Sequence, residues 1–395
     1  MVGRPDTGRR VASVVVTAAM DGTVEPGFER VRDAFAVNLG EHGDVGAAFA
    51  AWHRGRPVVS LWGGVADDTS GRPWSEDTTV LVFSMTKALT ATCVHHLAER
   101  GGLDLDVPIT AWWPEFGGQG KEAVTLRMIL GHRAGLPVVE GHFSMDEVLS
   151  WDPVVEALAG QTPLWEPDSA HGYHLRTYGW LVGEVFRRAT GGRTVARYAE
   201  EEVVGPIGVD WTIGLHADRS GDVARLVPPP PDYLEMLASL GDLLLVRAAG
   251  TPSDLFRYDD MWNEPRLRAA ELPSSTSFTN AAQAARFYAE LVGMGDGPGI
   301  LRPETLASAV ELRSAGPDRV LLIETAFGSG YMLAATLPSA AGPRSFGHSG
   351  AGGSVGFVDP DAGLAIAYTT NTLRFEASLD ARSESLVSAL YDCLA

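Results

Sequence analysis

Segments with strand character lie at both ends of this chain, and segments with helical character lie between them. Two β-rich runs near the N-terminus, residues 45–52 and 58–65, are separated by a turn-forming sequence. Four further β-rich runs follow near the C-terminus, at residues 327–335, 344–348, 353–358 and 364–370. Because strand signals are few in between, we predict one antiparallel sheet built from both chain ends, with a mainly helical insertion.

This arrangement places the chain in the α+β class, with helices flanking the antiparallel sheet. We assign residues 21–102 and 300–395 to a sheet lobe and residues 103–299 to a helical lobe, with residues 1–20 as an N-terminal tail. Hydrophobic periodicity and helix stop signals predict helices at residues 27–38, 87–100, 125–130, 154–159, 177–190 and 376–394.

The composition is that of an ordinary globular protein, since 45% of the 395 residues are hydrophobic and 21% are charged. The formal net charge of −19 argues against nucleic acid and anionic membranes as partners. No apolar run approaches the length of a transmembrane helix, so we predict no membrane span. Cys93 and Cys393 lack metal-ligand spacing, and we interpret both as reduced, small apolar residues.

The N-terminal tail has two interpretations. Arg9 and Arg10 precede a short apolar run at residues 11–20, as they would in a secretory signal peptide. Thr17 interrupts that run, so we favour a frayed tail and a cytoplasmic location, with secretion as the alternative.

The sequence Ser84-Met85-Thr86-Lys87 is the strongest candidate for a catalytic centre. An apolar run precedes it and a helix-forming run follows it, so Ser84 and Lys87 would lie one turn apart on one helix face. A serine hydroxyl is a weak nucleophile unless a base removes its proton, and a desolvated lysine can be that base. Alone, the same spacing is also typical of a solvated helix start with a capping serine.

Two downstream segments could complete such a centre. Tyr173 lies in a loop just before a predicted helix, and a nearby ammonium would favour its tyrosinate form. The segment His348-Ser349-Gly350-Ala351-Gly352-Gly353 lies at a strand end, where glycines leave backbone N–H groups free to donate. The alternatives are a packing tyrosine and an ordinary β-bulge.

In their order along the chain, these three motifs resemble those of the serine β-lactamase-like superfamily. That superfamily includes class C β-lactamases, penicillin-binding proteins, D-amino-acid peptidases and the family VIII carboxylesterases. Residues 130–137 and 173–181 are most similar to the carboxylesterase branch. The resemblance extends from Gly27 to the end of the chain and implies an active site between the two lobes.

The resemblance also implies a role for each motif residue. Ser84 corresponds to the acylated nucleophile, Lys87 to its lysine partner and Tyr173 to the tyrosine of the second motif. Residues 348–350 correspond to the strand that binds the substrate. The oxyanion hole would consist of the backbone N–H groups of Ser84 and Ala351, and such donors are typically worth ~3–4 kcal/mol each in acyl transfer.

Three positions depart from the family pattern. Leu175 and His348 replace an asparagine and a lysine that contact the substrate in β-lactamases, and with Ser349 and Gly350 they form the predicted substrate-binding set. Asp168 replaces an expected glycine in the loop that carries the tyrosine. The first two changes remove polar contacts for penicillins and cephalosporins, whereas the nucleophile and its bases remain.

We therefore predict a carboxylesterase that cleaves short to medium chain esters through an acyl-enzyme on Ser84, without a metal or organic cofactor. Its partner is a small-molecule ester, and the sequence gives no oligomeric state. An acyltransferase using the same acyl-enzyme is the first alternative, followed by β-lactamase or D-amino-acid peptidase activity. Retention of the three motifs disfavours a non-catalytic binding domain. We further expect the pKa values of both Lys87 and Tyr173 to be lowered.

Overall fold

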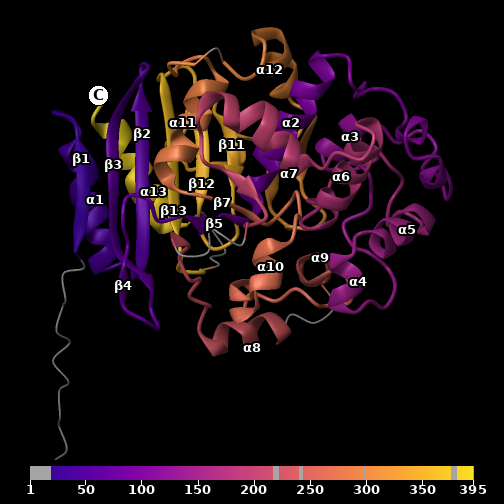
Figure 1. Ribbon diagram of the computed structural model, residues 1–395, viewed down its shortest axis with the longest axis horizontal. Helices are drawn as coiled ribbons and strands as arrows, with labels where there is room; N and C mark the ends of the chain where they lie inside the picture. Colours follow the sequence, from indigo (N-terminus) through magenta and orange to yellow (C-terminus); the bar gives the residue numbers. More distant parts are fainter. Residues whose placement is uncertain (1–18, 217–221, 240–242, 298, 375–379, 395) are drawn as a thin grey trace, which may run out of the picture.

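The computed structural model describes residues 19–216, 222–239, 243–297, 299–374 and 380–394 (Figure 1). Residues 1–18, which include most of the predicted tail and of the candidate signal segment, lie outside the described residues. The fold combines helices with antiparallel sheets, so the predicted α+β class is confirmed. No helix in the described ranges is both long enough and apolar enough to cross a membrane.

The main sheet has ten strands, and nine of them follow the order β1-β3-β2-β13-β12-β11-β10-β9-β8, with β4 paired to β3. Neighbouring strands are antiparallel throughout. The strands are β1 (Met20–Val24), β2 (Gly46–His53), β3 (Arg56–Asp67), β4 (Arg72–Pro73), β8 (Ser314–Pro317), β9 (Glu324–Phe327), β10 (Met332–Leu333), β11 (Phe346–Ser349), β12 (Val355–Asp359) and β13 (Leu364–Thr370).

The pairing of β2 with β13 joins the two ends of the chain in this sheet. Its register is continuous from Leu364 opposite His53 to Thr370 opposite Ala47. A smaller antiparallel sheet, in the order β5-β7-β6, lies beside helix α2 (Thr86–Glu99). It consists of β5 (Val80–Leu81), β6 (Thr212–Ile213) and β7 (Ser277–Thr279). The predicted sheet built from both chain ends is therefore confirmed.

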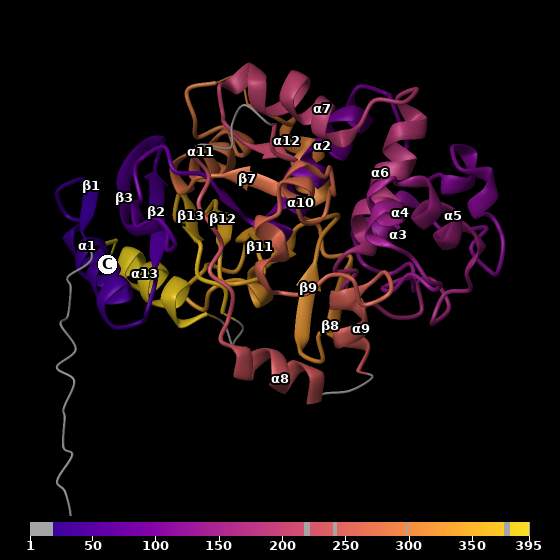
Figure 2. The ribbon, with the colours of Figure 1, turned by 60° about the horizontal axis from the view of Figure 1, so that its bottom comes forward.

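Alternate residues of the central strands face two different helical layers, because successive side chains of a strand point to opposite faces. On β13, Leu364, Ile366 and Tyr368 join an apolar cluster with α1 (Glu29–Gly40) and α13 (Ala381–Asp392). Ala365 and Ala367 instead join the cluster that contains α2 and α11 (Ala281–Leu291). Figure 2 shows α1 and α13 side by side next to the strands.

The middle of the chain supplies most of the remaining helices. They are α3 (Leu126–Leu130), α4 (Met145–Leu149), α5 (Asp152–Gly160), α6 (Thr177–Ala189), α7 (Val195–Tyr198), α8 (Pro231–Ser239), α9 (Leu244–Gly250), α10 (Pro265–Ala269) and, after α11, α12 (Pro303–Ala309). Helices α3 to α6 lie on the side of the molecule away from α1 (Figure 1). The division into two lobes at residues 102 and 300 stays a prediction.

One predicted strand is wrong. The run 327–335 was expected to form a single strand, but β9 ends at Phe327 and β10 begins at Met332. Between them the chain turns, with Gly330 at a φ of +94° and the N–H of Gly328 bonded to the carbonyl of Tyr331 at 2.9 Å. Two glycines within the run explain the turn, because glycine readily adopts positive φ.

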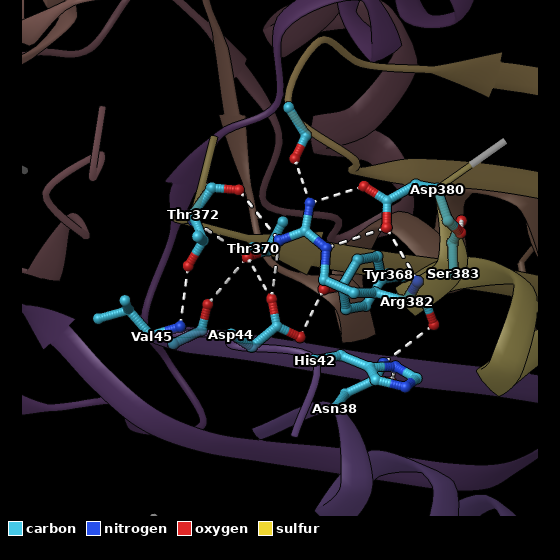
Figure 3. A network of polar contacts seen from close by, with 12 residues as sticks. Asn38, His42, Asp44, Val45, Tyr368, Thr370, Thr372, Asp380, Arg382 and Ser383 are labelled. Atoms are coloured by element: carbon cyan, nitrogen blue, oxygen red, sulfur yellow. Dashed lines mark hydrogen bonds and ion pairs between the residues drawn. The ribbon is translucent and has the colours of Figure 1, made fainter. Parts of the chain in front are cut away.

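A buried ion network ties the last helix to the sheet (Figure 3). Arg382 donates to Asp44 Oδ1 at 2.9 Å, to Asp380 Oδ1 at 2.9 Å and to the carbonyl of Gly352 at 2.7 Å. The hydroxyl of Tyr368 donates to Asp44 Oδ2 at 2.7 Å. Both charged groups of the central pair are almost fully buried, so each depends on the other for compensation.

We expect Arg382→Met to lower the free energy of unfolding by about 3–5 kcal/mol, because it leaves the Asp44 carboxylate buried without a counter-charge. Urea unfolding of both proteins would measure the difference. Arg344→Met is the matched control, because Arg344 pairs with Asp361 on the exposed surface and should change stability little. Equal effects of the two substitutions would contradict the assigned importance of the buried network.

Candidate active site

Ser84 lies in a short 3-10 turn, η1 (Phe83–Met85), which connects β5 to α2. The residue before it, Phe83, has a φ of +45°, an unfavourable backbone conformation for a bulky side chain. Packing holds it there, since the Phe83 ring meets the rings of Trp262 at 5.1 Å and Tyr258 at 5.9 Å. Ser84 itself remains partly exposed. The turn therefore presents a serine hydroxyl from a rigid, strained backbone.

Two glycines allow this turn to sit directly against the main sheet. A Cβ at Gly350, just after β11, would lie 2.2 Å from the carbonyl oxygen of Val82. A Cβ at Gly356 on β12 would lie 2.8 Å from Cε of Met85. A larger residue at Gly350 would collide with the backbone just before the Ser84 turn, whereas at Gly356 it would meet the side chains of Tyr288 and Met85.

Lys87 is the closest polar partner that the structure records for the Ser84 hydroxyl. Its Nζ lies 2.9 Å from Ser84 Oγ, 2.8 Å from the carbonyl oxygen of Leu175 and 3.1 Å from that of Ser274. The side chain is fully buried, and this desolvation, together with the charge of Arg176, holds its pKa well below the usual 10.5. The predicted lowering of the Lys87 pKa is confirmed.

The two carbonyl contacts define the orientation of a neutral Lys87 amine. A carbonyl oxygen can only accept, so Leu175 and Ser274 each take one N–H of the amine. A neutral amine has two N–H groups and one lone pair. The lone pair then faces the Ser84 hydroxyl, which is the arrangement that proton removal from a serine requires.

Tyr173 enters the site from the loop before α6. The two carboxylate oxygens of Asp318 accept its backbone N–H at 3.1 and 3.0 Å. Its ring stacks on Phe327 with centroids 5.8 Å apart and meets the edge of His132 at 4.7 Å. Lys87 Nζ lies 4.8 Å from the centre of the Tyr173 ring. Lys87 and Tyr173, which are 86 positions apart in the sequence, are thus brought together.

The expected lowering of the Tyr173 pKa is wrong. Complete burial raises the pKa of this phenol well above its usual 10, and the neighbouring Ser84 side chain opposes the shift only in part. The expectation assumed a charged lysine beside the ring, but the same burial also disfavours the Lys87 ammonium. Burial therefore favours the neutral amine of Lys87 and the protonated phenol of Tyr173.

The third motif lies on β11 and the turn that follows it. His348 is buried, its Nδ1 lies 2.7 Å from the carbonyl oxygen of Ser349, and burial lowers its pKa to about 3. Neutral His348 provides no positive charge for a substrate carboxylate. Ser349, Gly350 and Ala351 are among the residues that line a groove of about 440 Å³, whose lining includes neither Ser84 nor Tyr173.

Leu175 and Ala351 are the remaining predicted residues. Leu175 supplies its backbone carbonyl to Lys87, while its partly buried side chain packs against apolar residues. Ala351 is partly exposed, and the next carbonyl, that of Gly352, accepts from Arg382 of the ion network in Figure 3. The oxyanion-hole assignment of Ser84 and Ala351 stays a prediction.

Several residues that support the site were not predicted. His132 accepts the backbone N–H of His174 at 3.2 Å, and His174 in turn accepts the N–H of Leu136 at 3.0 Å. These contacts join residues 130–137 to the tyrosine loop, so the two carboxylesterase-like segments form one unit. Asp318 carried no sequence signal, and Arg176 lies within the carboxylesterase-like residues 173–181 but was given no role there.

Asp168 has a backbone conformation that explains why a glycine was expected there. Its φ is +72°, in the left-handed region that glycine adopts most readily. Asp tolerates this region better than most residues, and its carboxylate pairs with Arg133. Within the described residues, no group of three or more His, Cys, Asp or Glu side chains is arranged to hold a metal ion.

Comparison with known proteins places this site in a family. The β-lactamase family model matches residues 28–390, and the chain belongs to this family. The chain is 33% identical over 381 residues to the esterase/beta-lactamase LipL of Mycobacterium tuberculosis, covering 93% of this chain and 85% of LipL. It is 31% identical to the esterase EstB of Burkholderia gladioli, covering 87% and 90% of the two chains.

Solved structures give the same result. The crystal structure of a family VIII carboxylesterase superposes with a TM-score of 0.85 at 33% identity, covering 95% of this chain and 100% of the other. The resemblance to the serine β-lactamase-like superfamily, and to its family VIII carboxylesterases, is therefore confirmed.

We expect the stability of the wild-type protein relative to Lys87→Met to rise with pH. Lys87 has its ordinary pKa in the unfolded chain and a lowered pKa in the folded protein. Between these two values the unfolded chain binds more protons, so raising the pH favours folding. Urea unfolding of both proteins at several pH values from about 7 to 10 measures this. A difference that does not change with pH would mean that Lys87 stays charged when folded.

Proposed function

We propose that this protein is a serine hydrolase that cleaves carboxylic esters through an acyl-enzyme on Ser84. The contact that carries the proposal is the 2.9 Å approach of the Lys87 amine to Ser84 Oγ, with both amine hydrogens directed to carbonyl oxygens. The esterase names of LipL and EstB and the solved carboxylesterase support it.

In the proposed acylation step, the Lys87 lone pair takes the proton of the Ser84 hydroxyl as Oγ attacks the ester carbonyl. The resulting oxyanion would be stabilised by the backbone N–H groups of Ser84 and Ala351. Lys87 is then an ammonium, and the tetrahedral intermediate carries the negative charge.

Tyr173 is proposed to act as the general acid. Its raised pKa keeps the phenol protonated, so it can donate to the alcohol oxygen as the ester bond breaks. The proton that Lys87 removed from Ser84 then restores the phenol. In deacylation Lys87 takes a proton from water, the hydroxide oxygen attacks the acyl carbonyl, and Ser84 regains its proton as the acid leaves.

The surroundings of the third motif favour esters over β-lactams. Penicillins and cephalosporins carry a carboxylate, and buried, neutral His348 offers it no counter-charge. At the other position that departs from the β-lactamase pattern, Leu175 presents an apolar side chain instead of an asparagine amide. Short to medium chain esters need neither contact.

We expect Ser84→Ala to fold normally and to lose both hydrolysis of p-nitrophenyl butyrate and labelling by a fluorophosphonate probe, because it lacks the only nucleophile of the proposed mechanism. Intact-mass analysis and steady-state kinetics measure the two losses. The control is Ser150→Ala, an exposed serine after α4 that should leave both unchanged. Labelling that persists in Ser84→Ala would overturn the assignment.

The same assays separate the alternatives. The proposal predicts a kcat/KM for nitrocefin far below that for p-nitrophenyl butyrate, and comparable values would instead indicate a β-lactamase. Addition of a short alcohol tests acyl transfer, because an acyltransferase would form the transfer ester in preference to the free acid.

We expect Tyr173→Phe to lower kcat by ~10²-fold or more for alkyl esters, because loss of a positioned general acid leaves an alkoxide to depart unprotonated. The loss should be much smaller for p-nitrophenyl esters, whose leaving group is a weak base. Tyr178→Phe is the matched control, since Tyr178 is also buried and its ring centre lies 5.7 Å from Lys87 Nζ. Equal losses for both ester types would remove Tyr173 from the acid role.

A further inference from the structure

Arg176 is a buried cation beside the candidate site. Only 3% of the residue is exposed, and it immediately follows Leu175, whose carbonyl binds Lys87. Its guanidinium lies over three aromatic rings, with centroids at 4.7 Å for Trp262, 5.0 Å for Phe256 and 5.5 Å for Tyr258. The same Trp262 and Tyr258 rings also hold the strained residue before Ser84.

Among the described residues, no acidic group accepts a hydrogen bond from this guanidinium. Nε donates to the carbonyl of Ala249 at 3.2 Å and Nη1 donates to the hydroxyl of Ser275 at 3.1 Å. Among the residues that the structure describes, Nη2 has no hydrogen-bond partner. A buried cation that faces aromatic rings instead of a carboxylate is unfavourable for folding, so its presence calls for a functional explanation.

Arg176 joins the two chain segments whose carbonyls hold Lys87. The hydroxyl of Ser274 donates to the Arg176 carbonyl at 3.0 Å, and the Arg176 side chain donates to the neighbouring Ser275. Leu175 and Ser274 are the two carbonyl acceptors of the amine. Gly179 permits this close approach, since a Cβ there would lie 2.8 Å from the Ser274 hydroxyl.

Arg176 also differs in charge from the other titratable groups around Lys87. Burial raises the pKa of two phenols and lowers the pKa of three imidazoles there, so all five are neutral near neutral pH: Tyr173, Tyr178, His132, His174 and His348. Asp318 lies behind the loop and binds the Tyr173 backbone. The Arg176 charge disfavours a second positive charge on Lys87.

We propose that Arg176 is a positioning residue that fixes the two carbonyl acceptors of Lys87 and, through its own charge, keeps this lysine a neutral amine. The proposal rests on the function proposed above, in which Lys87 is the base. Arg176 touches neither the nucleophile nor the reacting atoms, so it acts only through Lys87.

The test compares the pH dependence of kcat/KM in three variants. The acidic limb of this profile is the range in which kcat/KM falls as Lys87 becomes protonated. Arg176→Gln removes the charge and should shift this limb to higher pH by ~0.5–1 unit, with a ~3- to 10-fold loss of kcat/KM at neutral pH. Arg176→Lys keeps a positive charge and should lower activity with little shift. Ser275→Ala breaks the contact with Nη1 but keeps the arginine, so its acidic limb should stay in place.

A purely structural role would lower activity without moving the acidic limb. A folded Arg176→Gln whose limb coincides with that of the wild type therefore overturns the proposal. If Arg176→Gln fails to fold, Arg176→Lys decides the question. This variant keeps the positive charge, so an acidic limb shifted in it as far as expected for loss of the charge would contradict the electrostatic role.

A second readout is independent of catalysis. The sequence has two lysines, Lys87 and Lys121, so ε-13C NMR of labelled lysine resolves the Lys87 titration directly. In Arg176→Gln this titration should move to higher pH by the same amount. If the wild-type protein hydrolyses no ester but the titration moves, the proposed function fails and the electrostatic role of Arg176 stands. If esters are cleaved but the titration does not move, the role of Arg176 fails alone.

Discussion

Burial of the Lys87 side chain is the constraint on which the rest of the site depends. A lysine without contact to water favours its neutral form, and only the neutral form can take the serine proton. The two carbonyl acceptors then fix the direction of its lone pair. The surrounding phenols and imidazoles are neutral as well, so Arg176 supplies the positive charge that acts on Lys87.

This burial requires parts of the chain that are far apart in sequence. The pairing of β2 with β13 closes the main sheet, and α11 packs on the face that carries alternate alanines of these strands, while α2 lies in the same apolar cluster and contacts β11. Gly350 lets the serine turn approach the end of β11, while Asp318 orients the tyrosine loop. Loss of any one of these contacts would admit water or shift an acceptor by a distance that matters for proton transfer.

Features with a local origin could be predicted from the sequence. β-rich runs next to turn-forming residues predicted β2, β3, β12 and β13, and the spacing of Ser84 and Lys87 placed both on one turn. The role of Tyr173 could be predicted only from the family resemblance, because no local pattern connects this residue to Ser84 and Lys87. The turn within residues 327–335 was missed because a β-rich composition outweighed its two glycines.

The ionisation of the site could not be predicted in full. The direction of a pKa shift depends on whether the effect of burial or the effect of neighbouring charges is larger. The extent of burial is known only once the fold is known. For Lys87 both effects have the same sign, so the prediction was right. For Tyr173 they oppose each other, and complete burial reverses the expected direction. Arg176 and Asp318 act through backbone contacts that no motif records.

The central claim is that Lys87 is a neutral base at the pH of catalysis. Its most direct test is an ε-13C NMR titration of the wild-type protein with labelled lysine, assigned by the Lys87→Met and Lys121→Met variants. Our account predicts that the Lys87 signal is that of a neutral amine across the pH range in which esters are hydrolysed. A Lys87 signal that remains that of an ammonium throughout this range would contradict it.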